Sequence, residues 1–192
     1  MKLTRNHQAP LLYLITDRRI LAQTRPGTHG ESELIVLVEF IEEAIDAGVD
    51  LIQLRERDLS GRELYDLAKA TVRIAAGTQT RILINDRADI AASLGAGVHL
   101  TTRSMTAGTV RETFGEELLI GVSTHNLIEL EGAERGGADF VVFGPVFETE
   151  SKKEYGPPVG LETLRAAAAA TPLPVLALGG INTVNHRAAL EA

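Results

Sequence analysis

The sequence contains no cysteine and no tryptophan, and aromatic residues make up only 4% of its 192 residues. Without cysteine the chain has neither disulfides nor thiolate metal sites, which fits a cytosolic protein. With so few aromatic side chains, a platform for stacked nucleic-acid bases is not expected. The net charge of −7 also disfavours broad nucleic-acid binding, which needs a basic surface. A small anionic ligand is still possible, because a few clustered cations set the local field.

Long hydrophobic runs are absent too. No run approaches the roughly 20 apolar residues that a membrane span requires. The apolar run near the start, "LLYLITD" (11–17), is short and ends in a threonine and an aspartate, so it predicts a first strand better than a signal peptide. We therefore expect a cytoplasmic protein with no membrane partner.

What is present is an alternation of short apolar runs with amphipathic stretches. The runs, which predict strands, cover residues 11–17, 49–56, 81–87, 97–101, 118–125, 139–146 and 174–180. Each is followed by a stretch with helical spacing, such as residues 33–48, or the stretch after Ser60, a predicted N-cap. The runs are continuously apolar, as in parallel strands covered on both faces. Seven βα units without a linker predict one domain over residues 1–192.

A parallel α/β sheet is either a TIM (β/α)8 barrel or an open doubly wound sheet. No Gly-x-Gly-x-x-Gly motif follows any run, and polar residues stand at the carboxyl ends of nearly all of them, which favours the barrel. The sequence ends where an eighth strand would begin. The eighth βα unit is therefore expected to be missing or incomplete, and a barrel left open on that side makes a homodimer possible.

Gln53, Arg55 and Arg57 alternate along "LIQLRERDLS", so in a strand they share one face. Guanidinium groups aimed into a barrel need an anionic partner, and their planar fork suits phosphate oxygens. The alternative is a solvated strand edge.

"ILINDR" ends in Asn85 and Asp86. Either residue could simply cap the next helix. The functional alternative gives Asp86 to a hard cation such as Mg²⁺, which takes one or two carboxylates together with substrate phosphate oxygens.

Further polar residues follow the later strands. Ser123 ends one run and His125 lies just beyond it, where it could bind substrate or cap the following helix, whereas His99 lies within an apolar run and is predicted to be structural. Residues 179–182, "GGIN", offer backbone N–H groups before a helix, a possible phosphate cradle. The loop after residues 139–146 carries Thr149, Ser151, Lys152 and Lys153. Together these residues indicate a site for phosphorylated small molecules.

Seven segments recur in order along almost the whole chain: "YLITD", "IQLRERDLSGREL", "LINDRADIAASLGAGVHL", "IGVSTHNL", "ADFVVFGPVFETESKK", "GPPVGLETL" and "PVLALGGI". In these segments the chain resembles the family of thiamine phosphate synthase and TenI, the thiazole tautomerase. The resemblance implies a TIM barrel in thiamine biosynthesis. It also implies a transferase that joins 4-amino-5-hydroxymethyl-2-methylpyrimidine diphosphate to thiazole phosphate, giving thiamine phosphate and pyrophosphate.

Carried over by motif, the pyrimidine diphosphate would be bound by Gln53, Arg55, Arg57, Asn85, Ser123 and Lys152. The thiazole phosphate would be bound by Thr149, Glu150, Ser151 and Gly180. Arg55, Ser123 and Lys152 would be catalytic, and Asp86 would hold Mg²⁺.

The chain departs from the synthase pattern at three places. Arg57 stands where the synthases have lysine, Ser104 stands where they have a second Mg²⁺-binding aspartate, and the eighth strand is missing. A TenI-like tautomerase, a metal-independent isomerase with His125 as its catalytic residue, is therefore the first alternative. A catalytically inactive phosphate-binding relative is the second. Asp86, and Pro145 in place of a histidine that the resemblance associates with TenI, favour the synthase.

Overall fold

The computed structural model describes residues 10–25, 32–149 and 157–192 of the chain. These residues form two compact units. The N-terminal unit is Leu11–Val98, and the C-terminal unit is His99–Ala192 together with Pro10. That residues 1–192 form a single domain stays a prediction.

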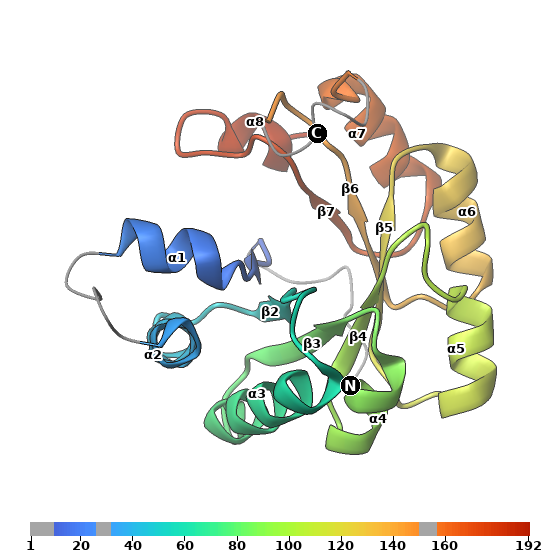
Figure 1. Ribbon diagram of the computed structural model, residues 1–192. Coiled ribbons are helices and arrows are strands. Elements are labelled where there is room, and N and C mark those ends of the chain that lie inside the picture. The colour runs from blue at the N-terminus through green and yellow to red at the C-terminus, as the bar shows by residue number, and fades with distance from the viewer. Residues whose placement is uncertain (1–9, 26–31, 150–156) are drawn as a thin grey trace. The chain divides into compact units, whose positions relative to one another are not determined.

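The N-terminal unit alternates strands and helices (Figure 1). Its elements are β1 (Tyr13–Ile15), α1 (Arg18–Thr24), α2 (Glu33–Asp46), β2 (Leu51–Leu54), α3 (Gly61–Ala75), β3 (Arg81–Asn85), α4 (Ala88–Leu94) and the start of β4 (Gly97–Leu100). β1, β2 and β3 pair in parallel, with Leu14 opposite Ile52 and Ile52 opposite Ile82. Their carboxyl ends therefore lie along one edge.

The C-terminal unit repeats the same alternation. Its elements are the end of β4, α5 (Ala107–Phe114), β5 (Ile120–Thr124), α6 (Leu127–Arg135), β6 (Phe140–Phe143), α7 (Gly160–Ala170), β7 (Val175–Ala177) and α8 (His186–Leu190). β5, β6 and β7 are parallel, with Val122 opposite Val141 and Val142 opposite Leu176. In Figure 1, α5 and α6 follow one another along the outside of these strands.

The strands follow sheet order β1-β2-β3-β4-β5-β6-β7, and seven are present among the described residues. Sequential parallel strands joined by helices are the topology of a TIM barrel. The prediction of an α/β fold of this class with seven strands is therefore confirmed.

Local sequence signals account for several helix starts. Ser60 accepts a hydrogen bond from the Glu63 N–H at 3.3 Å, and the Glu63 carboxylate accepts one from the Ser60 N–H at 2.9 Å, so the predicted N-cap is part of a capping box. Helix α1, in contrast, was not expected. It begins after Asp17, which accepts a hydrogen bond from the Ile20 N–H at 3.2 Å.

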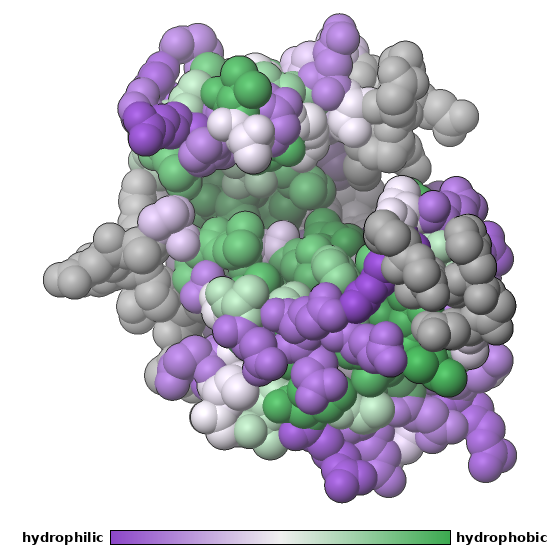
Figure 2. All heavy atoms as spheres, turned by 90° about the vertical axis from the view of Figure 1, so that its left-hand side faces the viewer, coloured by the Kyte–Doolittle hydropathy of each residue, from purple (hydrophilic) through white to green (hydrophobic). Residues whose placement is uncertain are grey.

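The strands carry the core, as their continuous apolar runs predicted. Every residue of β2 and β6 is buried, and the largest fully buried side chains include Phe140 and Phe143. The face of the molecule shown in Figure 2 mixes hydrophilic with apolar surface, in line with several large hydrophobic residues that remain exposed, such as Val184. No helix among the described residues has the length and apolar character needed to cross a membrane.

Gly121 lets the ring of Phe140 pack against β5. A methyl group on Gly121 would lie 2.7 Å from Phe140 Cε1, and the ring is fully buried. We expect Gly121→Ala to lower the free energy of unfolding by about 1–3 kcal/mol through overpacking, measured by urea denaturation. Gly132→Ala is the matched control, because a methyl group there, within α6, meets nothing within 4 Å. It should raise stability by ~0.5–1 kcal/mol, and equal losses in both variants would contradict the packing argument.

Candidate active site at the carboxyl ends of the strands

Two buried amides lie at the carboxyl ends of β2 and β3. Gln53 is 1% exposed and Asn85 is 8% exposed. The Gln53 Nε2 donates a hydrogen bond to Asn85 Oδ1 at 2.9 Å. Gln53 Oε1 is buried and accepts no hydrogen bond from the described residues. A buried acceptor without a donor costs about 1–3 kcal/mol, so this oxygen is suited to receive a donor from a ligand.

Asp86 fixes the orientation of both amides. Asn85 Nδ2 donates to Asp86 Oδ2 at 2.9 Å. Because an ionised carboxylate only accepts, the Asn85 amide must turn its NH₂ toward Asp86 and its oxygen toward Gln53. Gln53 must then present its NH₂ to Asn85, which leaves its oxygen for another donor.

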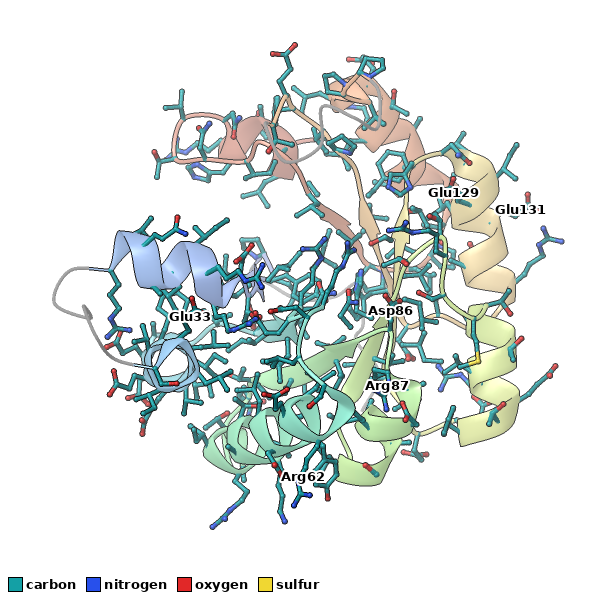
Figure 3. The ribbon with its side chains drawn as sticks, viewed as in Figure 1. Glu33, Arg62, Asp86, Arg87, Glu129 and Glu131 are labelled. Carbon is teal, nitrogen blue, oxygen red and sulfur yellow. The ribbon has the colours of Figure 1, made fainter. Side chains whose placement is uncertain are left out.

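Asp86 itself lies just beyond β3 and is exposed (Figure 3). Its backbone φ is 60°, which lies in the left-handed region that residues other than glycine rarely adopt. The alternative that Asn85 or Asp86 caps the next helix is wrong, since the N-cap of α4 is Arg87, without a side-chain cap hydrogen bond. A strained backbone at an exposed carboxylate is typical of a functional position.

A magnesium ion at Asp86 would need ligands from elsewhere. Among the described residues, no group of three or more histidine, aspartate or glutamate side chains could hold a metal ion. Mg²⁺ commonly takes one or two carboxylates and completes its shell with substrate phosphates and water. The exposed carboxylate of Asp86 fits that mode.

The prediction that Gln53, Arg55 and Arg57 alternate on one strand face is wrong beyond Gln53. β2 ends at Leu54, and the chain turns at residues 57–59, with the Leu59 N–H donating to the Glu56 carbonyl at 3.3 Å. Arg55 is half-buried and its N–H donates to Thr16 Oγ1 at 3.0 Å, whereas Arg57 is exposed. The physical reason is the intervening Glu56, which is only 5% exposed and is held by groups that precede α1 or begin it.

Those groups form a cluster around Arg18 that sequence reasoning missed. Glu56 accepts hydrogen bonds from Thr16 Oγ1 at 2.6 Å and from Arg18 Nη1 at 2.9 Å. Arg18 Nη1 also donates to Asp58 Oδ1 at 2.7 Å, and Arg18 Nε lies 3.2 Å from Glu33 Oε2. Figure 3 shows Glu33 at the start of α2. The only sequence signal is the pattern Arg-Glu-Arg-Asp at residues 55–58, in which each cation neighbours an acid.

The cluster shifts the titration of its charged groups. Hydrogen bonds from Arg18 are the main reason why the pKa of Asp58 lies well below its usual range. The same contacts, with those to Glu56, raise the pKa of Arg18 above its ordinary value. Both groups are therefore charged at neutral pH.

In the C-terminal unit, Ser123 lies near the end of β5 and is half-buried. Its Oγ is 2.8 Å from Nε2 of His99 in β4. His99 is 3% exposed, so its predicted structural position inside the strand is confirmed. This hydrogen bond holds the serine oxygen beside the His99 ring.

His125 follows β5 and pairs with Glu129 of α6, whose side chain is shown in Figure 3. The carboxylate Oε2 of Glu129 lies 2.9 Å from His125 Nδ1 and accepts a hydrogen bond from the His125 N–H at 2.8 Å. Both side chains are about one-third exposed. The alternative that His125 caps α6 is wrong, because Asn126 accepts the capping hydrogen bond from the Glu129 N–H.

The loops after β6 and β7 are joined by backbone hydrogen bonds. The Val146 N–H donates to the Leu178 carbonyl at 2.8 Å, and the Phe147 N–H donates to the Gly179 carbonyl at 3.0 Å. Half-buried Thr149 follows in the first of these loops. Glu150, Ser151 and Lys152 lie outside the described residues.

Gly179 and Gly180 make the second loop a tight turn. Their φ angles are 96° and 64°, and a Cβ on Gly180 would lie 2.5 Å from the Glu148 carbonyl oxygen. The N–H groups of Gly179, Gly180 and Ile181 donate to no acceptor among the described residues. Such a run of N–H groups is a typical anion cradle.

Ser104 takes part in its own turn. Its Oγ accepts a hydrogen bond from the Thr101 N–H at 2.6 Å and lies 3.0 Å from Thr101 Oγ1. The position at which the resemblance expects a second metal-binding carboxylate therefore carries a hydroxyl engaged in local structure.

Comparison with known proteins places these residues in a family. Residues 12–192 match the family described as thiamine monophosphate synthase. A relative from Geobacter sulfurreducens is 45% identical over 182 residues, which cover 94% of this chain and 80% of the relative. The thiamine-phosphate synthase of Clostridium novyi is 38% identical over 180 residues, which cover 93% of this chain and 83% of that protein.

Solved structures agree with this result. The thiamine phosphate pyrophosphorylase of Pyrococcus furiosus has a TM-score of 0.78 and 33% sequence identity, covering 94% of this chain and 80% of that one. A 3-dehydroquinate dehydratase from Geobacillus kaustophilus has a TM-score of 0.63 at 17% identity and shows the fold alone. The family predicted from the sequence motifs is confirmed. The chain belongs to the thiamine monophosphate synthase family.

Proposed function

We propose that this protein is a thiamine-phosphate synthase, a transferase of thiamine biosynthesis. It joins 4-amino-5-hydroxymethyl-2-methylpyrimidine diphosphate to thiazole phosphate and releases pyrophosphate. The observation that carries the proposal is the 37–45% identity to three relatives over almost the whole chain, among them proteins named thiamine-phosphate synthase. The polar residues at the strand ends supply chemistry that fits it.

The pyrimidine diphosphate has a ring with a hydrogen-bond donor and an anionic diphosphate, and we assign different residues to the two parts. The exocyclic amino group of the pyrimidine is a hydrogen-bond donor that suits the buried Gln53 Oε1. Arg55 and Arg57 supply guanidinium groups for the diphosphate oxygens, and Ser123 supplies a hydroxyl whose oxygen is held beside His99. Lys152 is assigned to the same anion from the sequence motif.

Asp86 is the residue assigned to Mg²⁺, with diphosphate oxygens and water as further ligands. When bound, the ion supplies charge that stabilises the departing diphosphate. Asn85 supports the site by holding the Asp86 carboxylate through its Nδ2. Because Ser104 stands in place of a second aspartate, the cationic side chains carry more of the stabilisation of the diphosphate charge.

The thiazole phosphate is assigned to the joined loops of the C-terminal unit. The N–H groups of Gly179, Gly180 and Ile181 provide donors for phosphate oxygens, and Thr149 adds a hydroxyl. Glu150 and Ser151 belong to this set by motif. Anion binding in the loops after the last strands is common in TIM barrels.

In the reaction, the bond between the pyrimidine methylene carbon and the diphosphate oxygen breaks, and the electron pair leaves with the diphosphate. The lone pair of the thiazole nitrogen then forms the new C–N bond. Arg55, Ser123 and Lys152 bind and orient the departing anion, so catalysis rests on positioning and electrostatic stabilisation.

One observation favours a second candidate, a TenI-like tautomerase. His125 Nδ1 lies 2.9 Å from Glu129 Oε2, a pairing that orients an imidazole and sets its tautomer for proton transfer. Such an isomerase would need no metal.

The first test is pyrophosphate release by the protein supplied with both substrates. We expect turnover with Mg²⁺ and its loss in excess EDTA, because the diphosphate charge is then not neutralised. His125→Ala should leave this turnover within about threefold of wild type, since the synthase proposal gives this residue no role. Turnover of a thiazole carboxylate phosphate in EDTA that disappears in His125→Ala would instead establish the tautomerase.

Two substitutions of Asp86 should differ in stability but share the loss of activity. In the left-handed region alanine is strained and glycine is not, so Asp86→Ala should be less stable than Asp86→Gly by about 1 kcal/mol in urea denaturation. Both variants should lose Mg²⁺-dependent turnover. The usual order, with alanine the more stable variant, would show that the backbone of Asp86 is not left-handed in solution.

Lys152 and Lys153 form a matched pair of neighbouring lysines. Lys152→Ala should raise the KM for the pyrimidine diphosphate about tenfold, because a hydrogen bond to a charged group is worth about 1.5–3 kcal/mol. Lys153→Ala should change it less than about twofold. Steady-state kinetics check both, and equal effects would refute the assignment of Lys152.

A further inference from the structure

The loop that carries Arg55 and Arg57 contains as much negative as positive charge. Glu56 and Asp58 alternate with the two arginines. Glu56 is buried, and a buried carboxylate is costly unless a cation pairs with it. The balance of charge in this loop is therefore set by groups outside it.

Arg18 is the group that meets both carboxylates. Its guanidinium donates to Glu56 Oε2 at 2.9 Å and to Asp58 Oδ1 at 2.7 Å, and its side chain is only 10% exposed. Arg19 adds a contact with Asp58 at 2.7 Å, and Glu33 lies 3.2 Å from Arg18. Arg18 thus contacts two carboxylates of the loop and one from α2.

Arg18 also fixes the path of the loop. The Arg18 N–H donates to Glu56 Oε1 at 3.2 Å, and Thr16 Oγ1 donates to the same oxygen at 2.6 Å. Thr16 Oγ1 in turn accepts a hydrogen bond from the Arg55 N–H at 3.0 Å. One chain of contacts therefore runs from Arg18 through Glu56 and Thr16 to the backbone of Arg55.

We propose that Arg18 is a positioning residue for the diphosphate-binding loop: it neutralises Glu56 and Asp58, so that the charge of Arg55 and Arg57 serves the anionic substrate. Without Arg18 the buried Glu56 loses its cationic partner, and the neighbouring guanidinium groups of Arg55 and Arg57 become available to pair with it. The inference rests on the proposed function only in assigning a diphosphate to this loop.

The test measures binding of inorganic pyrophosphate in Mg²⁺ buffer by isothermal titration calorimetry. Arg18→Met should raise the Kd roughly tenfold, because the local potential at the loop falls. The ratio of the two Kd values should shrink as the salt concentration rises, since screening weakens an electrostatic effect. In steady-state assays the KM for the pyrimidine diphosphate should rise, while the KM for the thiazole phosphate should stay within about twofold.

Arg111→Met is the matched control for the loss of a buried arginine. Arg111 is 11% exposed, pairs with Asp139 at 2.9 Å and donates to the carbonyl groups of Gly137 and Leu118. None of these contacts of Arg111 involves residues 55–58. This variant should lose comparable stability and bind pyrophosphate within about twofold of wild type.

Asp58→Asn tests the same charge balance without breaking the buried pair, and it remains informative if Arg18→Met does not fold. Removing one exposed carboxylate should tighten pyrophosphate binding by about two- to threefold. Arg18→Met combined with Asp58→Asn should bind more tightly than Arg18→Met alone.

Three results would overturn the proposal. They are equal binding by Arg18→Met and Arg111→Met, weaker or unchanged binding by Asp58→Asn, and a KM increase shared equally by both substrates. If the wild-type protein neither bound pyrophosphate nor turned over both substrates, the proposed function would fail, and this inference would fail with it. If wild-type binding and turnover were intact, any of the three results would reject the role of Arg18 alone.

Discussion

Parallel pairing of consecutive strands is the constraint on which the candidate site depends. Within each unit the paired strands run in the same direction, so paired strands end at the same edge. Side chains that are far apart in the sequence, such as Gln53 and Asn85, thereby come within hydrogen-bonding distance. The buried apolar residues of β2, β3 and β6 stabilise the sheet. The residues just past the strand ends are not needed for this packing and can contact a ligand.

The sequence predicted those parts of the structure that depend on local patterns. Continuous apolar runs located the seven strands, and Ser60 with Glu63 marked the start of α3. Helix α1 was missed because "RRILAQT" is short and precedes residues typical of a loop, while its stabilising contacts reach forward to Glu33, Glu56 and Asp58. Contacts between residues 15 to 40 positions apart leave no periodic signal.

At the candidate site, the structure corrects part of the geometry that local sequence patterns predicted. Alternation placed Arg55 and Arg57 on a strand face, but the burial of Glu56 ends the strand before them. Asn and Asp before a helix suggested a cap, yet Asp86 adopts a left-handed backbone and Arg87 is the N-cap. In the first case the pairing of buried Glu56 with Arg18 outweighed the strand pattern, and in the second the Asp86 carboxylate accepts a hydrogen bond from Asn85 instead of capping the helix.

The hydrogen bonds from Gln53 through Asn85 to Asp86 form a chain with a single direction. The direction is set at one end, because only the carboxylate lacks a proton to give. It follows that the protonation of Asp86, or a neutral amide in its place, would allow both amides to rotate and exchange their donor and acceptor ends. The face that Gln53 offers to a ligand would then change from acceptor to donor. Under the proposed function, Asp86 would therefore decide, through Asn85, whether Gln53 recognises an amino-substituted or an oxo-substituted ring.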